Sequence, residues 1–129
     1  MVLRTLLAFL AMTICFGGVV GQERASGATI VASGQTTRVG LINPVDPQSC
    51  KVSDDLVATV SREAAAGEIE LRRESVILTT SRCVQVEVMG YAIYYRSQRG
   101  FVGRDRVAVT FRNETRNITD VYFFALDVR

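Results

Sequence analysis

Several residue types are absent or scarce in this chain, and their absence excludes much catalytic chemistry. The sequence has no histidine, no tryptophan, two prolines and one lysine. Without histidine, Ser-His and Cys-His nucleophile pairs, histidine acid–base catalysis and most zinc sites are excluded. Carboxylates remain as acids or bases, but the adjacent pair Asp54 and Asp55 would point apart on a strand, so a solvated turn is favoured over a shared acid–base site.

A phosphate-binding loop and a cationic block are also lacking. Gly100 and Gly103 lie three apart, but no lysine or helix pattern follows them as a phosphate loop requires. The 15 basic and 13 acidic residues are scattered, so no stretch marks a nucleic-acid surface. We therefore expect no catalytic, cofactor-binding or metal-binding residues. Heavy use of arginine with almost no lysine is typical of a GC-rich bacterial genome.

The first 21 residues have the three parts of a secretory signal peptide. Arg4 gives a basic start, an apolar run from Thr5 to Gly21 follows, and Val19 and Gly21 provide small residues before a cut at Gln22. A retained membrane anchor is the alternative, although a spanning helix needs about 20 apolar residues and this run is shorter and broken by a glycine pair. Residues 22–27 are small and polar and predict a flexible start to a single domain over 28–129.

Cleavage would reduce the three cysteines to two. Cys15 lies inside the predicted signal peptide, which leaves Cys50 and Cys83. An even pair in an exported chain predicts a disulfide, and two reduced thiols are the alternative. A closed loop of about 34 residues would stabilise the fold by roughly 3.8 kcal/mol if chain entropy alone is counted.

Short stretches rich in Val, Ile, Thr, Tyr and Phe predict an all-β domain. Eight or nine strands bounded by turn residues favour a single antiparallel β-sandwich, with candidate strands at 29–32, 37–42, 56–60, 68–72, 76–80, 84–88, 91–95, 106–112 and 120–128. The one stretch that favours helix is Ser61 to Ala66, which Gly67 would end after barely two turns.

Alternation within the candidate strands predicts which side chains face the core. Three inward rows are expected: Val107, Val109 and Phe111; Tyr122, Phe124, Leu126 and Val128; and Tyr91, Ile93 and Tyr95. Arg106, Ala108, Thr110 and Arg112 would then point away from the core.

The stretch from Tyr95 to Asp105 carries the most specific pattern. It resembles the signature of bacterial immunoglobulin-like and cadherin-like repeat domains, which run Tyr-x-Pro-x-x-Gly-Phe-x-Gly-x-Asp into an alternating strand. The residues on the pattern are Tyr95, Gly100, Phe101, Gly103 and Asp105, and Ser97 stands where proline is usual. The resemblance implies an immunoglobulin-like sandwich over roughly residues 50–128 and implies no activity, because such folds host many functions.

The same residues also have a direct physical interpretation. Gly100 and Gly103 allow positive φ between two strands, and Phe101 between them can pack into the end of the core. Asp105 can accept hydrogen bonds from turn amides. The alternative for Asp105, a calcium ligand, would need six to eight oxygens, and no second cluster of Asp or Asn accompanies it.

Two further features suggest surface roles. Tyr94, Arg96, Arg99 and Arg104 form a candidate exposed binding surface, because aromatic rings with arginines can stack on sugars or meet acidic polymers, with ordinary strand packing as the alternative. Asn113 and Asn117 each begin an N-glycosylation sequon, which matters only in a eukaryote; in a bacterium both are turn residues.

Together these patterns predict a periplasmic or secreted, non-catalytic module with a binding or structural role at the cell envelope. Loops or an exposed strand edge would meet an unknown protein or an envelope polysaccharide. We expect no cofactor, no nucleic acid, and contact with a membrane only during export. The alternative is a small secreted enzyme or enzyme inhibitor.

Overall fold

The computed structural model describes residues 27–53, 55–114 and 116–129, and all regular structure in this part of the chain is β. The strands are β1 (Thr29–Val31), β2 (Thr36–Ile42), β3 (Leu56–Arg62), β4 (Gly67–Leu78), β5 (Val86–Ser97), β6 (Gly103–Asn113) and β7 (Ile118–Val128). The described residues contain no helix long and apolar enough to cross a bilayer. The predicted signal peptide, residues 1–21, and residues 22–26 of the predicted flexible segment lie outside the described residues.

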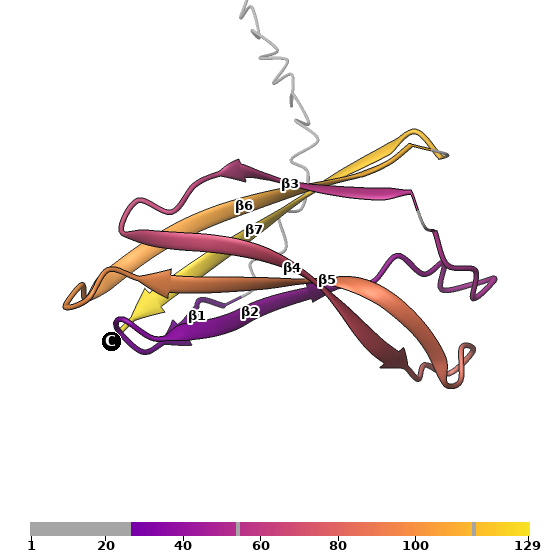
Figure 1. The fold of residues 1–129 in the computed structure, drawn as a ribbon, viewed down its shortest axis with the longest axis horizontal. Coiled ribbons are helices and arrows are strands. Elements are labelled where there is room, and N and C mark those ends of the chain that lie inside the picture. Colours follow the sequence, from indigo (N-terminus) through magenta and orange to yellow (C-terminus); the bar gives the residue numbers. More distant parts are fainter. Residues whose placement is uncertain (1–26, 54, 115) are drawn as a thin grey trace, which may run out of the picture.

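The strands form two sheets that pack face to face, as Figure 1 shows, so the predicted β-sandwich is confirmed. Sheet A has the order β1-β7-β6-β3, and sheet B has the order β2-β5-β4. β1 pairs with β7 in parallel, and every other pairing is antiparallel. The chain therefore moves repeatedly from one sheet to the other, and neighbours in sequence share a sheet only in the β4–β5 and β6–β7 hairpins.

The core lies between the sheets and is built from the alternating rows. Buried side chains come from both sheets: Val31, Ile93, Tyr95, Val107, Val109, Phe111, Leu126 and Val128. The rows over 91–95, 107–111 and 122–128 thus face inward as predicted. Tyr122 lies at the end of its row, where it is 41% exposed and meets Phe111 edge-on, with ring centroids 5.4 Å apart.

Gly40 sets how closely the sheets approach near the middle of the sandwich. A Cβ at this position would lie 2.6 Å from Phe124 Cε1 and 3.2 Å from Ile93 Cδ1. The register between β2 and β5 shifts between Arg38 and Gly40, which lets Val39 also pack against the core. A bulge and a missing side chain together make room for the Phe124 ring.

The predicted breaks at residues 73–75 and 89–90 are wrong. Residues 68–72 and 76–78 belong to one strand, β4, and residues 86–88 and 91–95 belong to one strand, β5, with twelve consecutive pairs between them. The apolar positions change parity along both strands, which imitates a strand end. The cause is that a different segment packs on the opposite side of the strand at this point. Gly90 faces the chain that follows β2, since a Cβ there would lie 2.8 Å from Asn43 Oδ1.

The stretch from Ser61 to Ala66, which favours helix by composition, forms no helix. Ser61 and Arg62 complete β3, and the following residues form a bend that leads into β4. The amides of Ala65 and Ala66 donate hydrogen bonds to Asp105. Because a helix of this length is marginal by itself, these tertiary hydrogen bonds decide the local conformation.

Candidate functional site

The carboxylate of Asp105 is buried at one end of the sandwich and accepts four hydrogen bonds. Oδ1 accepts from the amides of Ala65 (3.0 Å) and Arg106 (2.8 Å). Oδ2 accepts from the amide of Ala66 (3.0 Å) and the phenol of Tyr95 (2.9 Å). The carboxylate therefore joins β5, β6 and the β3–β4 connection.

This environment fixes the protonation of both partners near neutral pH. Burial raises the pKa of Asp105, but its hydrogen bonds outweigh that effect and hold the pKa below its ordinary value. Burial, followed by the hydrogen bond to Asp105, raises the pKa of Tyr95 well above that of a free phenol. Asp105 thus stays ionised and Tyr95 stays protonated, which suits a structural lock. Within the part of the chain that the structure describes, no group of three or more acidic or cysteine side chains is placed to hold a metal ion.

The β5–β6 turn uses the two glycines of the motif. Gly100 has φ of 83° and Gly103 has φ of 143°, both in the region that favours glycine. Phe101 between them packs against the buried cluster at this end of the core. The five motif residues are therefore brought together, with the Tyr95–Asp105 hydrogen bond inside and the turn above it.

The predicted disulfide is confirmed at the other end of the molecule. Cys50 and Cys83 are joined by an S–S bond of 2.07 Å with a Cα–Cα distance of 5.4 Å. Cys83 lies in the β4–β5 loop and is 2% exposed, whereas Cys50 lies in the connection between β2 and β3. The bond thus ties a sheet-crossing connection to the tip of the long hairpin.

Asp46 organises the connection that carries Cys50. Its Oδ1 accepts hydrogen bonds from the amides of Gln48 and Ser49, and its Oδ2 accepts one of 2.6 Å from Arg116 in the β6–β7 loop. The Arg116 hydrogen bond and then the two amides lower the pKa of Asp46 to about 2. The connection is therefore held covalently to sheet B and by an ion pair to the hairpin of sheet A.

The outward side of sheet B has charges that pair with one another. Its ion pairs are Arg38–Glu74 (3.5 Å), Arg72–Glu70 (2.7 Å) and Arg96–Glu68 (2.9 Å). Tyr94 lies among them: its hydroxyl donates to Glu74 at 2.6 Å, and the Arg72 guanidinium lies 4.3 Å from its ring centroid. This surface is neutral, and its aromatic ring is already covered.

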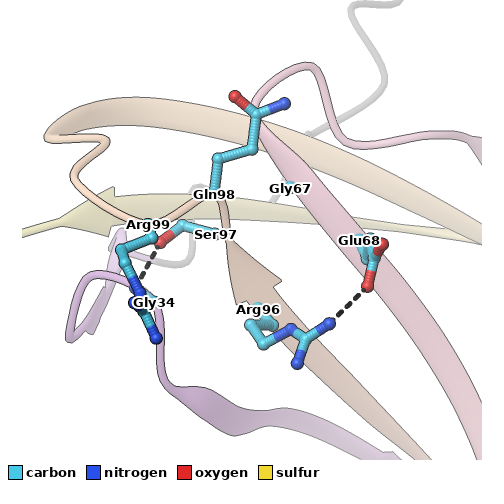
Figure 2. Close-up of a pocket in the computed structure, with 7 residues that line it drawn as sticks. All are labelled: Gly34, Gly67, Glu68, Arg96, Ser97, Gln98 and Arg99. Carbon is cyan, nitrogen blue, oxygen red and sulfur yellow. Dashed lines mark hydrogen bonds and ion pairs between the residues drawn. The ribbon is translucent and has the colours of Figure 1, made fainter.

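A polar recess of about 420 Å³ lies where the β1–β2 and β5–β6 turns meet the start of β4, as Figure 2 shows. Its walls come from Gly34, Gly67, Glu68, Arg96, Ser97, Gln98 and Arg99. The Gly34 amide donates to Ser97 Oγ at 2.8 Å, and Arg96 pairs with Glu68, the one carboxylate of the lining. The single carboxylate of this lining is thus already engaged in an ion pair.

The outward side of sheet A has a different character, and we name it the arginine face. It consists of Arg62, Arg104, Arg106 and Arg112 with the exposed apolar side chains Val57, Val121 and Phe123. Among the described residues, no carboxylate lies within ion-pairing distance of these four arginines. Asp127, near one end of the face, pairs with Arg129 at 2.8 Å.

The β-ladder shows how the arginine face is arranged. Ala108 of β6 lies opposite both Arg62 of β3 and Phe123 of β7. Val57 lies opposite Arg112. Cationic and apolar side chains thus alternate over three neighbouring strands, and Phe123, at 62% exposure, is the most exposed aromatic residue of the set.

The structure divides the surface that the sequence suggested. Tyr94 and Arg96 lie on the outward side of sheet B, Arg99 lies beside the recess, and Arg104 belongs to the arginine face on the other sheet. The sequence-based surface omitted most of the arginine face. Alternation already placed Arg106 and Arg112 outward, but the neighbours of β6 had to be known before the face was visible.

The two sequon asparagines shape the β6–β7 hairpin. Asn113 Nδ2 donates to Ser53 Oγ at 2.9 Å, and its Oδ1 accepts from the amide of Arg116 at 3.0 Å. Asn117 has φ of 52°, a conformation that asparagine tolerates better than most residues. Both positions thus have a conformational role in the turn.

Comparison of the chain with protein-family models, with curated proteins and with solved structures finds no match. Function is therefore argued from the geometry of the chain itself.

Proposed function

We propose that the chain is an exported, non-catalytic immunoglobulin-like module that binds an acidic partner at the cell envelope through the arginine face. The strand order supports the immunoglobulin-like class: β3, β6 and β7 share one sheet and β2, β5 and β4 share the other, as strands C, F, G and B, E, D do in that fold. β1 joins β7 instead of β2, which is a variation at the sheet edge.

The contrast between the two outward surfaces carries the proposal. Both have several arginines, but those of sheet B form ion pairs with glutamates, whereas four on sheet A form no ion pair with any described carboxylate. Exposed Val121 and Phe123 lie beside them. Guanidinium groups bind carboxylates and phosphates in fixed geometry, so the face suits an acidic protein or an acidic envelope polysaccharide.

The disulfide supports export. Disulfides form and persist in oxidising compartments and are rare in a reducing cytosol. Mass spectrometry of the mature protein, with and without reductant, tests this part. We expect a chain that begins at Gln22 and gains two mass units on reduction; a retained leader or free thiols at Cys50 and Cys83 would contradict export.

Photocrosslinking in the producing cell tests the binding surface. A crosslinking residue at Phe123 should give adducts with an acidic partner, and the same residue at Tyr94, on the paired surface, should not. Replacing Arg106 and Arg112 with glutamate should reduce the adducts at least tenfold. Adducts from Tyr94 alone, or adducts that survive the charge reversal, would reject the arginine face as the contact surface. Mass analysis of each adduct separates a second copy of this chain from another partner.

A further inference from the structure

The edge strands of the two sheets are protected to different degrees. β4 is an edge of sheet B and carries a run of charged side chains: Glu68, Glu70, Arg72, Arg73 and Glu74. β2 and β3 each have a register shift that interrupts the edge, between Arg38 and Gly40 and between Val60 and Arg62. Charges and bulges of this kind are the usual means by which sheets avoid pairing with other chains.

β7 lacks this protection over most of its length. β1 pairs only with Leu126–Val128, although β7 begins at Ile118. Residues 118–125 have β6 on one side, and within the described chain no strand pairs with them on the other. Figure 1 shows β1 at the C-terminal end of β7, while the β6–β7 hairpin extends away from it.

The open part of β7 is apolar. The five residues from Val121 to Ala125 include no charge, proline or glycine. Ile118, Val121, Tyr122 and Phe123 are 46%, 47%, 41% and 62% exposed. A mostly apolar strand edge with exposed aromatic and β-branched residues, and with backbone groups that no described strand pairs, is a template for pairing with another strand.

We propose that two copies of the chain associate through antiparallel pairing of their β7 edges over residues 119–125. The charge pattern favours a second copy as the occupant. Asp120 is the single charged residue of the open segment. A two-fold axis that passes through the pair formed by Tyr122 and its own equivalent sets Asp120 against Phe124 of the second copy and not against its own equivalent, so like charges do not meet. An acidic partner would gain nothing from this edge, whose single charge is the carboxylate of Asp120.

The pairing joins the two A sheets into one continuous sheet of eight strands. A two-fold axis perpendicular to the sheet keeps both arginine faces on the same side, as an isologous interface requires. A dimer of this kind would present eight unpaired arginines to one acidic polymer and increase its avidity without a new contact. The dimer itself needs neither export nor an acidic partner, so its test is separate from that of the proposed function.

Sedimentation of the purified oxidised protein over a range of concentrations tests the dimer. The seam is smaller than a standard protein interface, so we expect monomer at about 1 μM and a doubled mass at several hundred μM. A single monomer mass over the whole range would overturn the proposal.

Matched lysine variants locate the interface. Replacing Val121 and Phe123 with lysine should weaken association at least tenfold, because edge lysines oppose strand pairing. Ile77→Lys with Val84→Lys, at 69% and 66% exposure in the long hairpin, removes similar apolar surface elsewhere and should leave association unchanged. Equal loss in both variants, or no loss in the first, would overturn the β7 seam.

Hydrogen exchange provides a readout that does not depend on variants. Alternate amides of residues 119–125 should exchange at least tenfold more slowly at high protein concentration than at low concentration. The free amides along β4 should show no such dependence. Exchange of the β7 amides at one rate over the whole concentration range would exclude the pairing.

Discussion

The Tyr95 hydroxyl donates a 2.9 Å hydrogen bond to Asp105 Oδ2, and this bond joins the two sheets, because Tyr95 lies in β5 and Asp105 in β6. Both residues are buried, at 0% and 4% exposure. The same carboxylate also holds the β3–β4 connection through two amides. One acidic side chain thus fixes three separate segments at this end of the sandwich.

Replacing Asp105 with alanine should destabilise the protein by about 3 kcal/mol, because buried amide and phenol donors lose a charged acceptor. Tyr95→Phe removes one of the four hydrogen bonds and should cost about 1 to 2 kcal/mol. Urea denaturation measures both variants. A loss for Asp105→Ala no larger than that for Tyr95→Phe would show that the amide hydrogen bonds contribute little.

The Tyr95–Asp105 pair should make stability depend on pH at both extremes. Asp105 has a depressed folded pKa, so its stabilisation is present above the unfolded pKa and is lost as pH falls through the folded one. Tyr95 has a raised folded pKa, so its contribution is present below a pH of about 10 and is lost above it.

Stability curves of the wild type and two variants check these signs. The stability difference between wild type and Asp105→Asn should be constant from about pH 5 to 8 and should shrink below about pH 4. Above about pH 10, wild type should lose up to about 1.4 kcal/mol per pH unit more than Tyr95→Phe. Parallel curves for wild type and both variants would contradict the protonation states given to the pair.

Loss of the disulfide should destabilise the protein by about 3 to 4 kcal/mol, because the bridge joins two positions 33 apart in the sequence and so restricts the unfolded chain. Reductant should lower the denaturation midpoint of the wild type to that of a Cys50→Ser, Cys83→Ser variant. The variant itself should not respond to reductant, which separates the bond from other effects of the reagent.

Gly67 should not tolerate alanine. A Cβ there would collide with the carbonyl oxygen of Arg96 and would lie 2.9 Å from Tyr95 Cε2, and a backbone atom cannot rotate away. Gly67→Ala should cost about 1 to 3 kcal/mol by overpacking, whereas Gly27→Ala, with open space around it, should be neutral. Thermal melting compares the two, and equal midpoints would mean that β4 shifts freely at this position.

Truncation of two isoleucines in the long hairpin should lower the stability of the protein by very different amounts. Ile93 is fully buried and Ile77 is 69% exposed, although each lies in a twelve-residue strand. Ile93→Ala should cost about 2 to 5 kcal/mol and Ile77→Ala less than about 0.5 kcal/mol. A large cost at Ile77 would indicate that the tip of the hairpin is covered in solution.

Local patterning predicted most strands because each inward row alternates around a buried position, as Val107, Val109 and Phe111 do. It failed where one side of a strand is packed against another segment in one part and exposed to solvent in another. At Gly90, the chain after β2 packs on the side of β5 that faces solvent further along the strand. It also failed at Ala65 and Ala66, whose conformation is set by Asp105, about 40 residues away in the sequence.

The candidate surface was harder to predict because it depends on which strands are neighbours. Alternation placed Arg106 outward but gave no sign that Arg62 would lie nearby, since β3 and β6 are distant in the sequence. Nor does alternation show that glutamates match the arginines of one sheet and not those of the other. Those facts follow from strand order, which single-strand patterns do not contain.

The parallel pairing of β1 and β7 has a mechanical consequence. Tension applied between Gly27 and Arg129 would load the hydrogen bonds of Thr29–Val31 in shear, so they would have to rupture together and not one by one. After rupture, the covalent link between Cys50 and Cys83 would still withhold 33 residues from extension. Reducing that link would lengthen the stretched chain by roughly 110 Å, so the oxidation state sets how far the molecule yields under load.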